Sequence, residues 1–307
     1  MMKKIIILIC LLTAGLTFRA QDHPDTLYVY YLGGQSNMDG YGNNQDLPSA
    51  LDKTFENVWI FHGNQVPDDQ PNGGSGIWSQ LQPGHGAGFA SNGITNQYSD
   101  RFGIELSFAR RLNELYPNRR IAIIKYSRGG TSLDSLGSDY GCWEPDYQGT
   151  NGINQYDNFL ATIRNATAVK DIDGDGTPDF LQSAGIVWMQ GESDSPTEEI
   201  ASRYFDHLKR LMDLIRAALR TDDLPVVIGK ISDSGQNERG KVWDYGELVQ
   251  YAQEEFAKTD GHAAIVRTTA HYGYSDPWHY DSEGYIDLGR AFADAMYRLE
   301  ESAKTTD

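Results

Sequence analysis

The chain alternates short apolar runs with longer segments in which apolar residues recur every three or four positions. The short runs are rich in β-branched and aromatic residues, and their near-continuous hydrophobicity is typical of strands buried on both faces of a parallel sheet. The predicted strands cover residues 27–32, 58–61, 121–126, 185–189, 226–231 and 263–266.

Three other segments carry a single apolar stripe at helical spacing. The stripe residues are Ile104, Phe108, Leu112 and Leu115, then Ile200, Tyr204, Leu208, Leu211 and Ile215, and finally Tyr285, Leu288, Phe292, Met296 and Leu299. The second helix has a clear start, with Ser195 as N-cap, Pro196 in the first turn and Glu198 completing a capping box. The third begins near Ser282. This alternation predicts an α/β fold, with one parallel sheet covered by helices on both faces.

One long segment, residues 63–103, shows no periodicity and is rich in Gly, Asn and Gln. A structureless stretch of this length is usually functional or mobile. Two interpretations are open: a loop layer over the functional site, with Trp78 and His85 as wall residues, or a variable surface insertion.

The N-terminus has the order of a secretory signal peptide: Lys3 and Lys4, then the apolar run 5–18, then polar residues. The run is too short for a comfortable membrane span, which needs roughly 20 apolar residues. We expect cleavage after Ala20, a secreted or periplasmic protein with no membrane attachment, and one domain over residues 21–307. Cys142 would then be the sole cysteine, which excludes an intrachain disulfide.

The charge of the chain argues against a polyanionic partner. Its 307 residues carry 43 acidic and 26 basic side chains, for a formal net charge of −17. Such a surface repels nucleic acid and anionic lipid. The oligomeric state stays open.

Chemistry is expected at the carboxyl ends of the strands, where open α/β sheets bind ligands. Three polar clusters follow predicted strands, and a fourth precedes the last helix: GGQSNM at 33–38, SRGGT at 127–131, WMQGESD at 188–194 and DPWH at 276–279. A serine beside glycines at a strand end can expose its hydroxyl, and an Asp three residues before a His can orient the imidazole. Each cluster alone could be a turn or a helix cap, but one sheet would gather all four. The chain order Ser, Asp, His is also that of α/β-hydrolases, whose G-x-S-x-G elbow needs Gly where this chain has Met38.

GGQSNM, SRGGTS, WMQGESD and DPWHYDSEGYIDLG together resemble the SGNH hydrolase superfamily, specifically its branch of sialate O-acetylesterases and carbohydrate esterase family 6 acetylxylan esterases. The resemblance spans roughly residues 27–299 and implies a three-layer α/β/α sandwich with a parallel, flavodoxin-like sheet. It implies Ser36 as nucleophile and His279 as general base, with Asp276 or, alternatively, Glu192 as the acid partner. The implied oxyanion hole comprises the backbone N–H of Ser36, a glycine N–H at Gly129 or Gly130, and the side chain of Gln190.

The implied function is a secreted serine esterase that removes O-acetyl groups from acetylated xylan or related glycans through an acetyl-enzyme, without any cofactor for catalysis. Substrate contacts are expected from Gln35, Arg128 and Trp278, with Tyr280 as a further aromatic beside them. Sialate O-acetylesterase is the first alternative, because Arg128 could pair with a sugar carboxylate. A non-catalytic carbohydrate-binding protein on the same fold is the second.

A separate acidic segment resembles the first part of a calcium loop. Its expected ligands are Asp171, Asp173, Asp175, Thr177 and Asp179, but Gln182 stands where the bidentate Glu would be. The sequence therefore allows either a structural calcium site or a plain Asp/Gly-rich turn.

Overall fold

The fold is built on a central sheet of seven strands in the order β11-β10-β9-β1-β8-β3-β4. The computed structural model describes residues 25–66, 70–148 and 154–304, so the predicted signal peptide lies outside the described residues. The strands of the sheet are β1 (Thr26–Gly34), β3 (Phe55–His62), β4 (Trp78–Leu81), β8 (Arg120–Ser127), β9 (Phe180–Met189), β10 (Val226–Gly229) and β11 (Ala263–Val266).

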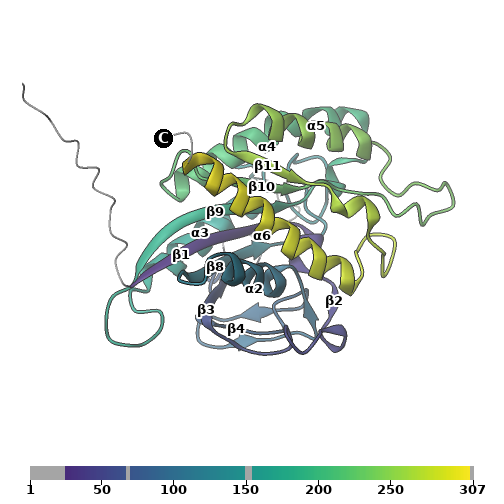
Figure 1. The fold of residues 1–307 in the computed structure, drawn as a ribbon. Coiled ribbons are helices and arrows are strands. Elements are labelled where there is room, and N and C mark those ends of the chain that lie inside the picture. Colours follow the sequence, from purple (N-terminus) through teal and green to yellow (C-terminus); the bar gives the residue numbers. More distant parts are fainter. Residues whose placement is uncertain (1–24, 67–69, 149–153, 305–307) are drawn as a thin grey trace, which may run out of the picture.

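Helices cover both faces of this sheet, which gives the predicted three layers. They are α1 (Ser36–Asp39), α2 (Glu105–Leu115), α3 (Gln155–Ala168), α4 (Glu198–Ala218), α5 (Gly246–Thr259) and α6 (Ser282–Lys304). Helices α6 and α2 lie side by side across one face, α3 and α4 lie behind the sheet, and α5 packs beside α4 (Figure 1).

Strand β1 is the centre of the fold because it pairs in parallel with both β8 and β9. All of its residues are buried, as its continuous apolar pattern predicts for a strand covered on both faces. The six predicted strands are all present. The sheet is parallel as expected except at one edge, where β4, a strand that the sequence did not predict, runs antiparallel to β3.

The segment 63–103 is more ordered than its composition suggested. It contains β4 and three two-residue strands, β5 (Ala90–Ser91), β6 (Asn96–Gln97) and β7 (Arg101–Phe102); β7 pairs with β2 (Gly42–Asn43). Trp78 packs against Phe61 and donates its indole N–H to the carbonyl of Ala166 at 2.9 Å, so it is a packing residue of the sheet edge.

The helical stripes are confirmed, but the cap of α4 differs from the prediction. Thr197 is the N-cap, and its side chain accepts the N–H of Ile200 at 3.3 Å. The Ser195 hydroxyl instead donates to the carbonyl of Glu192 at 2.7 Å, so that Ser195 closes the preceding turn. Both Ser and Thr can cap a helix, and sequence alone could not choose between two candidates two residues apart.

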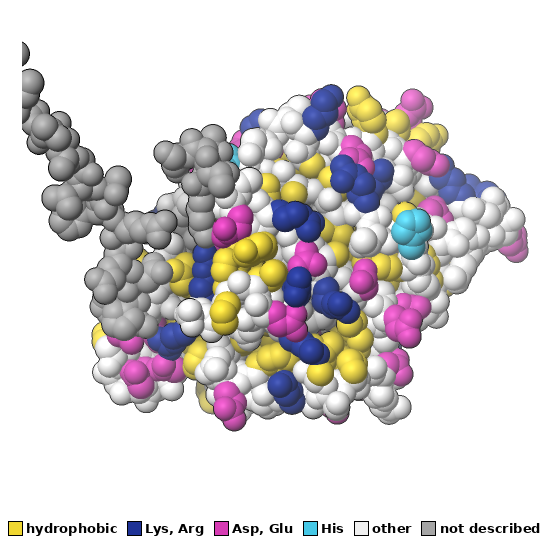
Figure 2. All heavy atoms as spheres, viewed as in Figure 1, with side chains coloured by type: hydrophobic (Ala, Val, Ile, Leu, Met, Phe, Trp, Pro, Cys, Tyr) yellow, Lys and Arg dark blue, Asp and Glu magenta, His cyan; other side chains and the backbone are white. Residues whose placement is uncertain are grey.

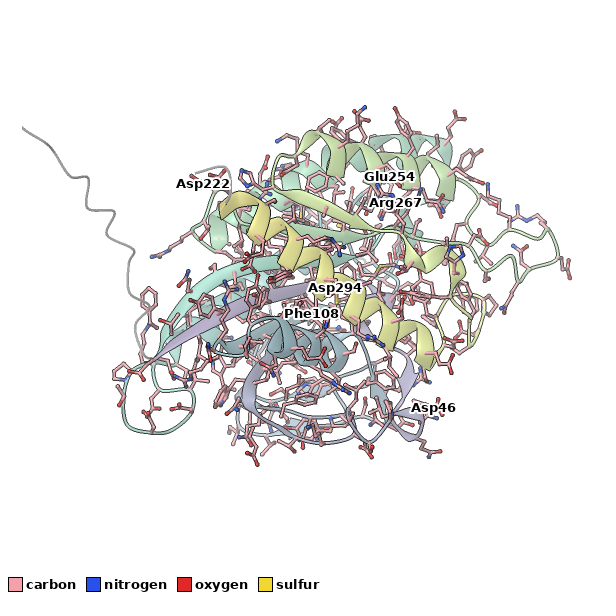
Figure 3. All side chains as sticks on the ribbon, in the orientation of Figure 1. Asp46, Phe108, Asp222, Glu254, Arg267 and Asp294 are labelled. Atoms are coloured by element: carbon pink, nitrogen blue, oxygen red, sulfur yellow. The ribbon has the colours of Figure 1, made fainter. Side chains whose placement is uncertain are left out.

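The face formed by α2 and α6 shows how the helices meet the sheet. Phe108 of α2 packs edge-on against Tyr30 of β1, with ring centroids 5.5 Å apart (Figure 3). On the outer surface, acidic and basic side chains are interspersed (Figure 2), and Arg111 pairs with Asp294 across the two helices at 2.7 Å. Within the described residues, no helix combines the length and the apolar character that a membrane crossing requires.

Candidate active site

The register of three neighbouring strands brings three of the predicted clusters together. Gly34, the last residue of β1, is level with Ser127 of β8 and Met189 of β9. The backbone N–H of Gln35 then bonds to Met189 at 2.9 Å, and that of Arg128 bonds to Gly34 at 3.1 Å. The loops that follow β1, β8 and β9 therefore start from one point at the carboxyl edge of the sheet.

Gly34 makes the turn into the serine loop possible. Its φ is +146°, and a Cβ at this position would lie 1.9 Å from the carbonyl oxygen of Met189. Only glycine fits such a close backbone approach. Ser36 follows as the first residue of α1, so its backbone N–H has no acceptor inside that helix.

Ser36 and His279 both line one open cavity of about 980 Å³ at this edge. Ser36 reaches it from the end of β1, and His279 from the loop before α6. The two residues lie 243 positions apart in the sequence, and the fold brings both to this cavity.

Asp276 is the hydrogen-bonding partner of His279. Its Oδ2 lies 2.7 Å from Nδ1 of His279, and its Oδ1 accepts the backbone N–H groups of Trp278 at 2.8 Å and His279 at 2.9 Å. Burial by itself would raise the pKa of Asp276, but these hydrogen bonds outweigh it and hold the pKa below the usual range. An ionised Asp276 fixes the Nδ1–H tautomer, which leaves Nε2 of His279 as the unprotonated nitrogen.

The His279 ring is also held by a stack that the sequence did not reveal. Tyr41 lies parallel to it, with centroids 3.6 Å apart and an angle of 4° between the planes. The Arg101 guanidinium lies over Tyr41, 4.6 Å from the ring centroid. Pairing of β7 with β2 places Arg101 beside Asn43, close to Tyr41 in the chain.

Glu192 serves a different contact. It is 2% exposed, and its Oε1 accepts the side-chain amide of Asn37 at 2.7 Å. The same amide donates to the carbonyl of Trp278 at 3.1 Å, so Glu192 supports the histidine loop through Asn37. Burial raises the pKa of Glu192. The geometry therefore favours Asp276 over Glu192 as the partner of His279.

The backbone donors of the expected oxyanion hole lie at the cavity. Gly129 and Gly130 both line it, and a Cβ on Gly129 would be 3.3 Å from the Cβ of Ser36. Gly129 thus allows the loop after β8 to approach the serine closely, which brings its backbone near the N–H of Ser36.

The expected role of the Gln190 side chain does not fit this geometry. Its amide nitrogen donates to the carbonyl of Thr131 at 3.1 Å and to Oδ2 of Asp194 at 2.6 Å, and the residue is fully buried. Both N–H groups therefore have acceptors beneath the cavity. Gln190 fixes the loops after β8 and β9 to each other.

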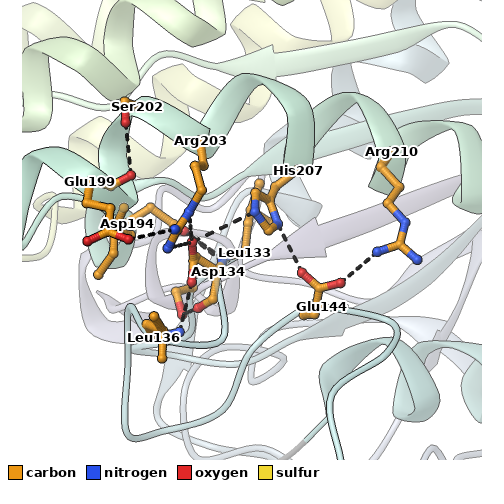
Figure 4. Close-up of polar contacts among 12 residues, drawn as sticks. Leu133, Asp134, Leu136, Glu144, Asp194, Glu199, Ser202, Arg203, His207 and Arg210 are labelled. Atoms are coloured by element: carbon orange, nitrogen blue, oxygen red, sulfur yellow. Dashed lines mark hydrogen bonds and ion pairs between the residues drawn. The ribbon is translucent and has the colours of Figure 1, made fainter.

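Asp194 is the centre of that attachment (Figure 4). Its carboxylate accepts the backbone N–H groups of Leu133 at 2.8 Å and Asp134 at 2.9 Å. Asp134 in turn pairs with Arg203 of α4 at 2.6 Å. The loop that carries Gly129 and Gly130 is therefore anchored to the helix behind the sheet.

The three residues expected to contact substrate all line the cavity, but they differ in hydrogen bonding and in exposure. The side-chain oxygen of Gln35 accepts the N–H of Gly191 at 3.2 Å, which gives it a structural role. Arg128 donates to Gln65 at 2.7 Å, while its buried Nε has no hydrogen-bond partner among the described residues. Trp278 is 51% exposed.

Other expectations about the wall were wrong. Tyr280 is fully buried, with its hydroxyl 3.2 Å from that of Ser232. His85 is also fully buried, with its Nδ1 3.4 Å from that of His62. From the segment 63–103, the cavity is lined instead by Gln65 and residues 86–89.

Sequence reasoning missed two residues close to the serine. Asp39, the last residue of α1, and Tyr41, two residues later, line the cavity in the same short stretch as Ser36. Burial raises the pKa of Asp39 to about 6, although Ser127 and Lys125 lower it. Their proximity to the nucleophile in sequence was the only available signal. Tyr140, Trp243 and Asp244 come from loops that carry no pattern.

Only some of the expected calcium ligands before β9 lie close together. Carboxylate oxygens of Asp171, Asp173 and Asp179 lie within 4.8 Å of one another. Arg120 already pairs with Asp173 at 2.5 Å and with Asp179 at 3.2 Å. The Asp175 carboxylate accepts the N–H of Thr177 at 2.7 Å and is outside this group. Three carboxylates against one guanidinium leave negative charge to neutralise, and calcium binding stays a prediction.

We expect calcium to raise the melting temperature by about 5 °C or more at roughly 100 times its Kd, because it binds only the folded chain. Asp171→Asn together with Asp179→Asn should remove this effect, whereas the exposed Asp222→Asn should keep it. Thermal unfolding with calcium and with chelator tests this. Superimposable curves for the unsubstituted protein would identify the segment as a plain turn in which Arg120 is the counter-ion.

Solved structures confirm the fold. A protein of Arabidopsis thaliana is 18% identical, covers 90% of this chain and 99% of its own, and gives a TM-score of 0.60. A carbohydrate acetylesterase from Xanthomonas citri is 17% identical; the alignment covers 90% of this chain and 57% of that protein, with a TM-score of 0.57. The protein NanS is 18% identical; the alignment covers 91% of this chain and 99% of NanS, with a TM-score of 0.57. No curated protein matches the sequence.

The sequence itself matches one family over residues 26–298, described as carbohydrate esterase, sialic acid-specific acetylesterase. The match spans the strand ends, the cavity and the histidine loop, and it agrees with the resemblance found in the four motifs. The chain therefore belongs to this carbohydrate esterase family and is a carboxylic ester hydrolase.

Proposed function

We propose that this esterase removes O-acetyl groups from neutral carbohydrate through an acetyl-enzyme formed on Ser36. The observation that carries the proposal is the contact of 2.7 Å between Nδ1 of His279 and Asp276, at a cavity that Ser36 shares. A nucleophile, a base and a group that orients the base are the parts that acyl transfer needs. This set leaves the non-catalytic binding alternative without support.

The proposed reaction has two steps. Nε2 of His279 takes the proton of the Ser36 hydroxyl as Oγ attacks the acetyl carbonyl, and Asp276 stabilises the imidazolium. The backbone N–H of Ser36 and that of Gly129 or Gly130 stabilise the oxyanion, and one such donor contributes about 3 kcal/mol. His279 returns the proton to the departing sugar hydroxyl. It then activates a water that releases acetate from Ser36.

The charge around the cavity favours a neutral sugar. Four acidic residues line it, against a single Lys or Arg side chain, that of Arg128; the acids are Asp39, Asp139, Glu192 and Asp244. Glu192 is buried with a raised pKa, and Asp244 pairs with Arg239 at 2.9 Å, so the remaining negative charge comes from Asp39 and Asp139. These two carboxylates would repel an anionic substrate, whereas sugar hydroxyls can donate hydrogen bonds to them. This supports acetylated xylan or a related glycan.

A sialate is the second candidate, and a specific observation favours it. Arg128 presents a buried Nε without a hydrogen-bond partner among the described residues, and it lines the cavity. A guanidinium with unused donors suits a carboxylate, which it can bind through two hydrogen bonds. The family description also names sialic acid.

We further propose that the protein is exported, on the strength of Lys3 and Lys4 ahead of the apolar run 5–18. Polymeric glycans do not cross membranes, so an enzyme that acts on them must reach the substrate outside the cytoplasm.

Ser36→Ala should lower kcat for hydrolysis of a small aryl acetate by at least about 10³-fold, because the covalent route disappears. The matched control is Ser202→Ala, an exposed serine of α4 outside the cavity, which should retain full activity. Steady-state kinetics on folded protein decide the outcome. If Ser36→Ala kept half of the activity, Ser36 would not be the nucleophile.

Asp276→Asn should lower kcat by about 10³-fold or more with little change in KM, because the amide no longer stabilises the imidazolium. Glu192→Gln preserves a hydrogen bond acceptor for Asn37 and should lower kcat less than about tenfold. Circular dichroism confirms that each variant is folded before kinetics are measured. A larger loss in Glu192→Gln would assign the acid role to Glu192 instead.

Substrate preference follows from the charges. Acetate release from acetylated xylo-oligosaccharides should exceed that from O-acetylated N-acetylneuraminic acid by about tenfold or more in kcat/KM. Arg128→Ala should widen this ratio, because it removes the pairing partner of the sialate carboxylate alone. A wild-type enzyme that prefers the sialate would establish the second candidate.

A further inference from the structure

We propose that Tyr140 and Trp278 are two sugar-stacking platforms flanking the reaction centre, so that the substrate is an oligosaccharide or polymer rather than a single sugar. This inference rests on the proposed function and extends it. The two residues lie on different loops and both line the cavity that holds Ser36 and His279.

Their exposure is the first reason. Tyr140 is 64% exposed and Trp278 is 51% exposed, whereas half of the aromatic residues in the described part of the chain are buried. When several large aromatic side chains are exposed at one cleft, they usually mark a binding surface. Their rings are rigid and amphipathic, so little entropy is lost when a ligand stacks on them.

Tyr140 is positioned on the oxyanion side. A Cβ on Gly130 would lie 3.0 Å from the Tyr140 ring, which places the ring against the glycine loop. Its backbone N–H donates to the Ser138 hydroxyl at 3.0 Å, and that hydroxyl bonds back to the carbonyl of Gly130. The Asp194 attachment described above holds the same loop on α4. The backbone under Tyr140 is therefore fixed while the ring faces solvent.

Trp278 is positioned on the base side. Its backbone N–H donates to Asp276 at 2.8 Å, and its carbonyl accepts from Asn37 at 3.1 Å. The indole centroid is 6.4 Å from that of His279. Here too the backbone is held at both ends while about half of the side chain remains exposed.

The size and chemistry of the cleft fit a chain of sugars. Its volume of about 980 Å³ is near the upper end of the range of about 300–1,000 Å³ for small-molecule sites. In this proposal the acetylated sugar lies at Ser36, and its neighbouring rings stack on the two platforms. The carboxylates of Asp139 and Asp244, which line the same cleft, can accept hydrogen bonds from hydroxyls of those rings.

The test compares chain length. Acetate release is measured on an acetylated xylo-oligosaccharide and on an acetylated methyl xyloside, and the ratio of the two kcat/KM values is the readout. Contacts remote from the ester stabilise the transition state only for the longer substrate. Tyr140→Ala and Trp278→Ala should each lower the ratio about tenfold. Tyr140→Phe and Trp278→Tyr should restore most of it, since both keep a flat ring.

Tyr251→Ala is the matched control, because Tyr251 is 69% exposed on α5 and lies outside the cleft. It should leave the ratio unchanged. If the two platform variants behave like this control, or lose activity equally on both substrates, the inference is wrong while the proposed function stands. A wild-type enzyme that cleaves aryl acetate but releases no acetate from either xylose substrate would overturn the proposed function, and with it this inference.

Discussion

A buried ammonium beneath the reaction centre ties the site together. Lys125 of β8 is fully buried, and its Nζ donates to Glu105 at 2.9 Å and to the carbonyls of Asp39 and His85 at 2.8 Å each. Its three N–H donors are thus all used, and they join β8 to α2, to the serine loop and to the segment 63–103. Removing one partner of such a pair costs about 3–5 kcal/mol, because the other charge is left buried and unpaired. The position of Ser36 therefore depends on an ion pair buried beneath the loop that carries it.

The same charge helps to decide which histidine can act as a base. Burial, and after it the nearby ammonium of Lys125, lowers the pKa of both His62 and His85, so these two imidazoles are held neutral. His279 has what they lack, a carboxylate on Nδ1. An aromatic ring lies on the face of all three imidazoles, Tyr41 on His279 and Phe89 on the other two. Asp276 fixes the direction of Nε2, and Tyr41 fixes the plane of the ring. Proton transfer needs both, because a hydrogen bond to Ser36 is directional.

The sequence predicts the parts of this site that depend on local rules. Its position at a strand end predicted that Ser36 lies at the ligand cavity, and a spacing of three residues within one turn predicted the contact between Asp276 and His279. The predicted oxyanion role of Gln190 does not fit for a physical reason. Its side-chain amide bonds to two acceptors below the cavity, and one of them, Asp194, becomes buried only when the loops meet. Tyr41, Tyr140 and the antiparallel β4 come from segments with no periodicity, where long-range packing rather than local preference decides the conformation.

At this site the backbone is held rigid while several side chains remain exposed, which suits the proposed removal of acetyl groups from varied glycans. Strand register and Gly34 fix where Ser36 lies, and the Lys125 and Asp194 attachments hold the loops around it. The acetyl group is the same in every substrate, so this part can be rigid. The sugar differs from one substrate to the next, and in our proposal it meets side chains that project from fixed backbone into an open cleft, among them Trp278 and Tyr140. Binding energy from these outer contacts then adds to catalysis without any change in the geometry around Ser36.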